Sequence, residues 1–126
     1  AYVLSTGTWS QPFLSRVGCE LGIEPVRGQI VLLEQRAPTF DYVIQSGPRY
    51  LVPRGDGRVL IGSTEERAGF QKETTAAGIA ELLSFGQRYV PGHHTARFER
   101  SWSGLRPYRT GGLPYVGRAP AAENLI

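Results

Sequence analysis

The sequence contains no methionine, a single cysteine (Cys19) and a single lysine (Lys72) among its 126 residues. One cysteine excludes an internal disulfide and a cysteine-based metal cluster, and Cys19 has no base nearby in sequence, so we expect an inert thiol. No apolar run approaches the ~18 residues that a membrane-spanning helix needs. The opening residues also lack the basic segment of a signal peptide. We therefore expect a cytoplasmic protein without a membrane span.

Several motifs that carry chemistry are missing as well. The sequence has no nucleophile elbow, no phosphate-binding loop and no GxGxxG fingerprint. His93 and His94 have no third ligand at a useful spacing, so no metal site is expected. The adhesion-like tripeptide at 54–56 overlaps Asp56-Gly57, which a hairpin turn already explains. Runs that interleave aromatic and basic residues are short, which disfavours nucleic-acid binding.

The formal net charge is +3, and the last quarter of the chain accounts for it. Residues 95–126 contain five arginines and two acidic residues, a surplus of three. A surplus on so short a segment suits a small anionic ligand better than a long polyanion. The dominance of arginine over lysine has two interpretations: recognition of anions by the guanidinium fork, or biased genomic composition.

The order of apolar patterns predicts an α+β fold, mostly antiparallel β-sheet with one main helix. A stripe at Ile79, Leu82, Leu83 and Gly86 predicts that helix over 76–89. A shorter helix is expected to begin near Ser10, with Leu14 and Val17 facing inward. We expect strands at 2–4, 26–34, 41–45, 49–54, 58–63 and 95–106, the first buried and the last ended by Pro107.

The hairpin between residues 49 and 63 is the clearest local signal. Asp56-Gly57 is a favoured pair for a two-residue loop, which would place Tyr50 opposite Ser63. The apolar runs at the two ends, 2–4 and 124–126, begin and stop abruptly, whereas natural termini usually trail off in polar residues. We therefore expect a fragment of a longer protein.

Arg106 is the first candidate site residue. Alternation along the last long strand places it on one face with Phe98, Trp102 and Gly104. An arginine beside aromatic side chains is costly unless it is paired, so Arg106 is either an ordinary salt-bridge or solvated residue, or a bidentate clamp for a substrate carboxylate. Gly104 leaves room on that face for a planar ligand. Tyr50 is either a half-buried strand tyrosine or a second donor to the same carboxylate.

These motifs occur in an order that resembles the flavin-dependent D-amino-acid oxidase superfamily, most closely the glycine oxidases of thiamine biosynthesis. The matching segments cover nearly the whole chain, and their order is more specific than any one of them. They are VLSTGTWS, PVRGQIVLLE, YLVPRGDGRVLIGST, GIAELL, SWSGLRP and GLPYVGRAP followed by NLI.

The resemblance implies roles for six residues. Arg106, in the GLRP motif, would hold the substrate carboxylate, and Tyr50, before the VPR motif, would line the same pocket. Four others would lie beside the FAD cofactor: Gly7, Trp9, Gly104 and Pro107. No side-chain acid or base is implied, because a hydride passes from the substrate α-carbon to the flavin, oxygen then yields peroxide, and the imine hydrolyses to an oxo acid and ammonia.

The resemblance also implies a division of the chain between two domains of a longer enzyme. Residues 1–24 would come from the FAD-binding domain, 25–105 would form most of an antiparallel substrate domain, and 106–126 would return. The sequence lacks the family's GxGxxG unit and its glycine-rich closing segment, so this chain alone is not expected to retain FAD. Gly111-Gly112-Leu113-Pro114 also departs from the Asp-Gly-Leu-Pro of many relatives.

The expected function is therefore oxidative deamination of glycine or a small D-amino acid by the full-length protein. The expected partners are the amino-acid substrate and the remainder of the chain, and a homo-oligomer is compatible with the sequence. One alternative is a stand-alone basic β-domain that binds a small carboxylate without catalysis. Another is a dimerising domain that pairs through an exposed sheet edge.

Overall fold

The computed structural model describes residues 1–35, 40–90, 92–120 and 122–126. Its helical elements are η1 (Gly7–Trp9), α1 (Ser10–Leu14), η2 (Ser15–Val17), α2 (Ala76–Tyr89) and η3 (His93–Thr95). Its strands are β1 (Glu24–Glu34), β2 (Ile44–Ser46), β3 (Arg49–Pro53), β4 (Arg58–Gly62) and β5 (Arg97–Tyr108). The expected α+β fold is confirmed, with α2 as the main helix.

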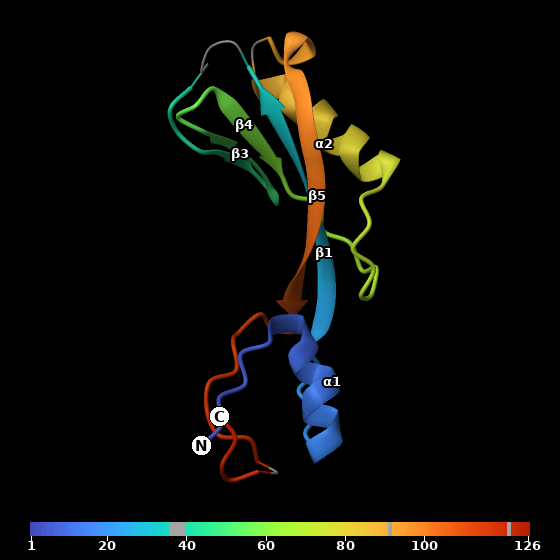
Figure 1. Cartoon of the computed structure of the whole chain (residues 1–126), viewed down its shortest axis with the longest axis vertical. Coiled ribbons are helices and arrows are strands. Elements are labelled where there is room, and N and C mark those ends of the chain that lie inside the picture. The colour runs from blue at the N-terminus through green and yellow to red at the C-terminus, as the bar shows by residue number, and fades with distance from the viewer. Residues whose placement is uncertain (36–39, 91, 121) are drawn as a thin grey trace.

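The five strands form one sheet in the order β2-β3-β4-β1-β5, and every neighbouring pair is antiparallel. The long strand β1 pairs with β5 along its whole length, whereas β4 pairs only with its second half. Figure 1 shows an elongated molecule, with α2 and the sheet towards one end and α1 with both termini at the other. Within the described residues, no helix is long and apolar enough to cross a membrane.

The main core lies between the sheet and α2. Val31 and Leu33 alternate along β1 towards the helix, and Leu82 and Phe85 face them from α2. Burial of such side chains stabilises the fold by roughly 1.5–3 kcal/mol each. The other buried members of this core are Leu51, Val59, Ile61 and Val90. A second, smaller cluster of Leu14, Cys19 and Leu125 holds the end that contains the termini.

Helix α2 has the predicted bounds, and its first turn is capped. The Thr75 hydroxyl accepts a hydrogen bond from the Gly78 amide at 3.1 Å. The expected end at Pro91-Gly92 is described only at Gly92, because Pro91 lies outside the described residues. Gly92 adopts a left-handed conformation, with φ of 74°, which favours glycine.

Gly78→Ala is expected to destabilise the protein although alanine is the better helix former. A methyl group at Gly78 would overlap the buried side-chain amide of Gln29 on β1. Overpacking costs about 1–3 kcal/mol, which outweighs the gain of about 1 kcal/mol in helix propensity. The exposed neighbour supplies the control, because Ala77→Gly should follow propensity alone. Thermal unfolding measures both changes, and a higher midpoint for Gly78→Ala would contradict the expected overlap.

The terminal segments differ from the prediction of a buried strand. Tyr2 makes one isolated parallel bridge to Leu125, and the side chains of Tyr2 and Val3 are exposed. In the short helical region Leu14 is buried as predicted, but Val17 is exposed. Val17 is in η2, where the tighter 3-10 winding changes the direction of the side chain relative to an α-helix.

The hairpin was predicted with the wrong register. Tyr50 pairs with Gly62 rather than with Ser63, and the loop has three residues, Gly55-Asp56-Gly57. The loop is closed by a hydrogen bond of 2.7 Å from the Arg54 amide to the Arg58 carbonyl. Gly57 has a φ of 83°, so it supplies the left-handed residue that ends a three-residue loop.

Strand β5 also departs from the prediction at two places. It continues through Pro107 to Tyr108, because β5 is an edge strand, where proline need not donate a ladder hydrogen bond. A register shift between Leu32 and Leu33 then puts Phe98 opposite Leu33. This bulge moves Phe98 to the face opposite that of Arg106, contrary to simple alternation.

Candidate functional site

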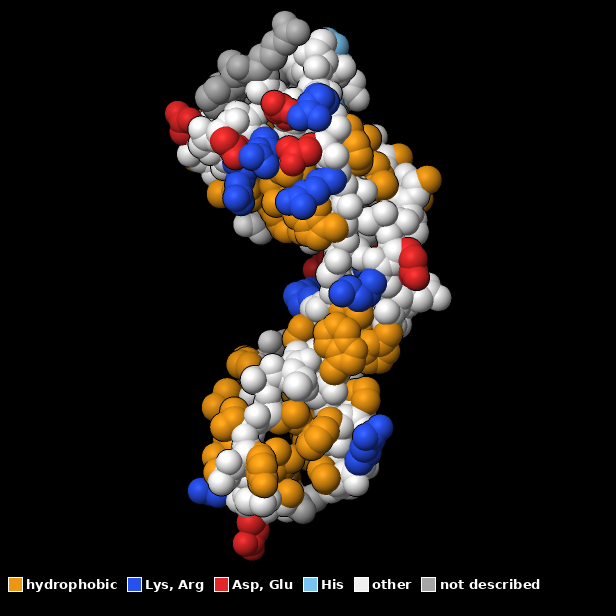
Figure 2. Space-filling model, in the orientation of Figure 1, with side chains coloured by type: hydrophobic (Ala, Val, Ile, Leu, Met, Phe, Trp, Pro, Cys, Tyr) orange, Lys and Arg blue, Asp and Glu red, His pale blue; other side chains and the backbone are white. Residues whose placement is uncertain are grey.

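The sheet face opposite α2 carries the predicted site residues of the strands. On β5, Trp102, Gly104 and Arg106 pair with alternate residues of β1. Tyr50 pairs with Gly62, and Gly62 pairs with Ile30 of β1, so Tyr50 faces the same side. We call this side, which α2 does not cover, the open face. Figure 2 shows basic (Lys or Arg) and acidic (Asp or Glu) side chains gathered at one end of it, next to hydrophobic side chains.

The side chain of Tyr50 packs on Gly62. A Cβ atom built on Gly62 would lie 2.6 Å from both the Cζ and the hydroxyl oxygen of Tyr50, so the phenol ring lies directly over the glycine. The Tyr50 side chain thus reaches from β3 across β4 in the direction of β1. Its hydroxyl makes no hydrogen bond with the described residues, and it is therefore available to a ligand.

Gly104 lies in a bare part of the open face. A Cβ atom built there would meet nothing within 4 Å. On one side of it is Trp102, whose ring has the Arg100 guanidinium at 4.9 Å from its centroid. On the other side is Arg106. The space directly above Gly104 is therefore open, and this part of β5 is exposed.

Arg106 projects from the open face into solvent, with 59% of its side chain exposed. Its Nη2 atom donates to Glu65 Oε1 at 2.8 Å. The salt bridge that the sequence left open is therefore present, but it uses only one of the guanidinium's five N–H donors. Among the described residues no second partner of this side chain is found, so the rest of the fork can bind an anion.

Arg106 and Tyr50 share a face but do not touch. Their rows meet β1 at Val26 and Ile30, which lie four residues apart. At about 3.3 Å per residue this is roughly 13 Å along the strand. The two residues also lie three strands apart, because Tyr50 is on β3 and Arg106 is on β5, and at about 4.8 Å per strand this adds roughly 14 Å across the sheet. Both side chains must therefore extend towards each other, at nearly full length, to bind one small ligand between them.

The two predicted cofactor residues outside the sheet lie next to it. Gly7 and Trp9 bound η1, which packs against β5. Trp9 is half-exposed, and its ring centroid is 5.9 Å from that of Phe70. Gly104 and Pro107 are on β5 itself. This end of β5 thus combines open space at Gly104 with an exposed aromatic ring, an arrangement that fits a large planar cofactor.

A buried polar network lies on the α2 side of the same strands, and no sequence motif predicted it. The Arg27 side chain, 8% exposed, pairs with Glu66 and donates to the Glu73 carbonyl at 3.0 Å. Fully buried Gln29 donates to Glu66 at 2.6 Å and to Thr75 at 3.0 Å. This network fixes the segment that follows β4 against β1.

The carboxyl of Glu66 is held in its charged form. Burial alone raises its pKa, but hydrogen bonds from Thr64, Arg27 and Gln29 and the charge of Arg27 outweigh burial and bring the pKa below its ordinary value of 4.5. A group whose pKa is lower in the folded state stabilises the fold above its unfolded pKa. That contribution disappears as the pH falls through the folded-state pKa.

Glu66→Gln is therefore expected to flatten the pH dependence of stability on the acid side. The unaltered protein should lose stability as the pH falls below 4.5, and the variant, already less stable at neutral pH, should lose less. Unfolding midpoints measured across the acid range test this. Parallel curves for the two proteins would show that Glu66 does not bind its proton more weakly in the fold.

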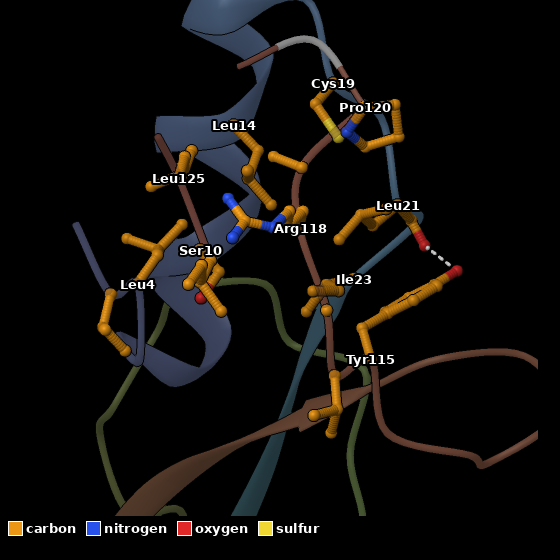
Figure 3. A pocket seen from close by; sticks show the side chains of 15 residues that line it. Leu4, Ser10, Leu14, Cys19, Leu21, Ile23, Tyr115, Arg118, Pro120 and Leu125 are labelled. Carbon is orange, nitrogen blue, oxygen red and sulfur yellow. Dashed lines mark hydrogen bonds between the residues drawn. The ribbon is translucent and has the colours of Figure 1, made fainter. Parts of the chain in front are cut away.

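A separate hydrophobic cavity lies between the two terminal segments. Its volume is about 480 Å³, and it is lined by side chains from residues 3–23 and 115–126. Figure 3 shows Leu4, Leu14 and Leu125 around it, and the Tyr115 hydroxyl, which donates to the Leu21 carbonyl at 2.9 Å. None of the open-face residues lines this cavity. In the described part of the chain, no cluster of His, Cys, Asp or Glu could hold a metal ion.

The chain is similar to known proteins in sequence and in fold. The model of the family described as FAD dependent oxidoreductase matches residues 1–126. Glycine oxidase of Pseudomonas putida is 38% identical over 123 residues, which are 98% of this chain and 34% of the relative. The chain thus spans about a third of the length of the curated relatives it matches.

Solved structures of two oxidases are also similar. The crystal structure of glycine oxidase from Geobacillus kaustophilus superposes with a TM-score of 0.93 at 33% identity, covering 99% of this chain and 34% of that one. Iminodiacetate oxidase from Chelativorans sp. BNC1 gives a TM-score of 0.90 at 29% identity, covering 98% and 34%.

Proposed function

Because the chain belongs to the FAD-dependent oxidoreductase family, we propose that the whole protein oxidises a small amino acid at the open face of this sheet. The observation that carries the proposal is the placement of Arg106, Gly104 and Tyr50 on one uncovered face. The open face offers a guanidinium and a phenol whose remaining donors have no partner among the described residues, with open space above Gly104. This combination suits a ligand with a carboxylate at one end.

The residues of the chain would position the substrate rather than exchange protons with it. Arg106 binds the carboxylate through charge-assisted hydrogen bonds, and the Tyr50 hydroxyl donates to the same group. Fixing one end of a small molecule in this way orients its α-carbon, and orientation is a large part of what a protein contributes to such a reaction. No acid or base of the open face is needed for this role.

FAD, when bound, supplies the two-electron acceptor. We assign Gly7, Trp9, Gly104 and Pro107 to the part of the chain that lies beside it. Gly104 contributes space, and Trp9 contributes an aromatic ring on the adjacent η1. The chain has no GxGxxG fingerprint, so we assign the main dinucleotide contacts to the remainder of the protein.

The proposed division of the chain has support from its shape. We assign 1–24 and 106–126 to the FAD-binding domain and 25–105 to the substrate domain. The two terminal segments lie together at one end of the molecule in Figure 1. They are joined by backbone hydrogen bonds such as that of 2.7 Å from the Tyr2 amide to the Asn124 carbonyl. The sheet and α2 extend away from them.

We propose glycine or a small D-amino acid as the substrate, with iminodiacetate as a second candidate. The first rests on the relatives named glycine oxidase, and the second on the similar fold of iminodiacetate oxidase. We propose the cytoplasm as the site of the reaction.

Anaerobic mixing of the whole flavin-loaded protein with these compounds tests the proposed function. Bleaching of the flavin absorbance by an amino acid, with ammonia and peroxide formed in air, is the expected result. Binding of a carboxylate without any flavin reduction would instead favour a binding module and contradict the proposed oxidation. A purified whole protein without a flavin absorbance band would contradict it too.

A further inference from the structure

Glu65 lies inside the proposed substrate site, although no sequence motif pointed to it. Its Oε1 atom accepts the hydrogen bond from Arg106, and 51% of its side chain is exposed. The segment that contains it continues along β1 after β4 has ended. Thr64 donates its amide to the Gln29 carbonyl at 3.3 Å, and Glu66 forms a bridge with Arg27. Glu65 therefore lies opposite Gly28, in the row that leads to Gly104.

The two neighbours of Glu65 fix its direction. Thr64 is 2% exposed, and its hydroxyl accepts the Gln29 amide at 2.9 Å. The Glu66 side chain reaches the α2 side, where it pairs with Arg27. Since successive side chains of an extended segment alternate, Glu65 faces the open side, where it meets Arg106. Its position is thus built into the sheet by the buried network beneath it.

We propose that Glu65 is a tethered competitor for the substrate carboxylate and sets which anions the site accepts. This inference rests on the proposed function, because it assigns Arg106 as the carboxylate clamp. The Glu65 carboxylate holds the guanidinium when the site is empty, and an incoming carboxylate displaces it. An exposed ion pair of this kind is weak, so displacement needs little energy.

When the substrate displaces Glu65 from Arg106, the charged Glu65 carboxylate stays next to the bound molecule. This charge favours one class of substrate. A free ammonium group on the ligand is attracted by Glu65, whereas a second carboxylate is repelled. The site therefore favours amino acids with one carboxylate and a cationic amine over dicarboxylates. Between the two candidates of the proposed function, this selects the monocarboxylate amino acid over iminodiacetate.

The test is calorimetric titration of acetate and malonate into the whole protein and into its Glu65→Gln variant. Glu65→Gln should increase the affinity for acetate about two- to fivefold, which corresponds to the energy of an exposed ion pair. The affinity for malonate should increase by a larger factor, because the repulsion between Glu65 and the second carboxylate of malonate is removed as well. Glu34→Gln is the matched control: Glu34 pairs with Arg97 at the far end of β1 and β5, so the same charge change there should leave both affinities unchanged.

The outcomes distinguish the competitor role of Glu65, the substrate class and the proposed function. Acetate affinity that is unchanged or weaker in Glu65→Gln overturns the competitor role, and so does equal tightening in Glu34→Gln. Equal factors for acetate and malonate overturn the proposed substrate class. The proposed function is tested separately, by flavin reduction with an amino acid in the unaltered protein. Melting temperatures of both variants, recorded alongside, should match that of the unaltered protein, because both side chains are about half exposed.

Discussion

Arg106→Ala in the whole protein is expected to raise the KM for the amino acid about 10²- to 10³-fold, with FAD still bound. In the proposed whole protein the remainder of the chain and the FAD would enclose the Arg106–carboxylate pair; removing one partner of such an enclosed charge pair typically costs 2–5 kcal/mol, and each ~1.4 kcal/mol is a factor of ten. FAD retention is expected because Arg106 is one exposed residue of this chain, whereas its neighbours Gly104 and Trp9 are untouched. Steady-state kinetics and the flavin absorbance spectrum measure the two effects.

Arg97→Ala is the matched control for this change. Arg97 is another exposed arginine of β5, and it pairs with Glu34 as Arg106 pairs with Glu65. It lies at the opposite end of the strand, so its loss should leave KM unchanged. Unaltered kinetics in Arg106→Ala would remove this residue from the proposed role. A similar rise of KM in both variants would show that the loss of positive charge, rather than the loss of a specific carboxylate-binding group, raises KM.

Arg27→Ala is expected to produce the largest loss of stability, about 3–5 kcal/mol. Breaking a buried ion pair by removal of one partner costs this much, because an uncompensated charge is left behind. Arg27 is almost completely buried, and its loss would leave Glu66 without its cation and the Glu73 carbonyl without its donor. Urea or thermal unfolding of the whole protein measures the change.

Two further variants separate the buried charge from general arginine loss. Arg67→Ala removes an exposed arginine that pairs with Glu24, and should change stability by less than about 1 kcal/mol. Arg27→Met with Glu66→Gln removes both charges, and should recover part of what Arg27→Ala loses. If Arg27→Ala and Arg67→Ala have equal effects, the buried pair does not hold the segment after β4.

The sequence predicted those elements whose signals are local. Helix α2 was predicted with its observed bounds because its apolar stripe and its Thr75 cap lie within a few residues of one another. Strand β1 was predicted over 26–34, a segment that contains the apolar run Ile30–Leu33, and it is observed from Glu24 to Glu34. The same local logic placed Arg106, Trp102 and Gly104 on one face correctly, because no irregularity interrupts that part of β5.

The features that sequence reasoning missed depend on contacts between distant residues. Phe98 changes face because β5 contains a bulge opposite β1, and no residue pattern within β5 predicts this bulge. The network of Arg27, Gln29 and Glu66 joins residues that are 37–39 positions apart. Glu65 is inconspicuous in sequence for the same reason: only the pairing of its neighbours with β1 brings it to Arg106, 41 positions away.

The joined ends of the chain have an evolutionary and practical consequence. Tyr2 and Leu4 exchange backbone hydrogen bonds with Asn124 and Ile126 at 2.7–2.8 Å, so these two segments run side by side. A module with adjacent entry and exit points can be transplanted as one cassette, because the recipient needs only a single gap in its surface. At the boundaries that we propose for the substrate segment, Pro25 pairs with Pro107 and Val26 with Arg106, so an exchange at these points would move the sheet and α2 as one unit.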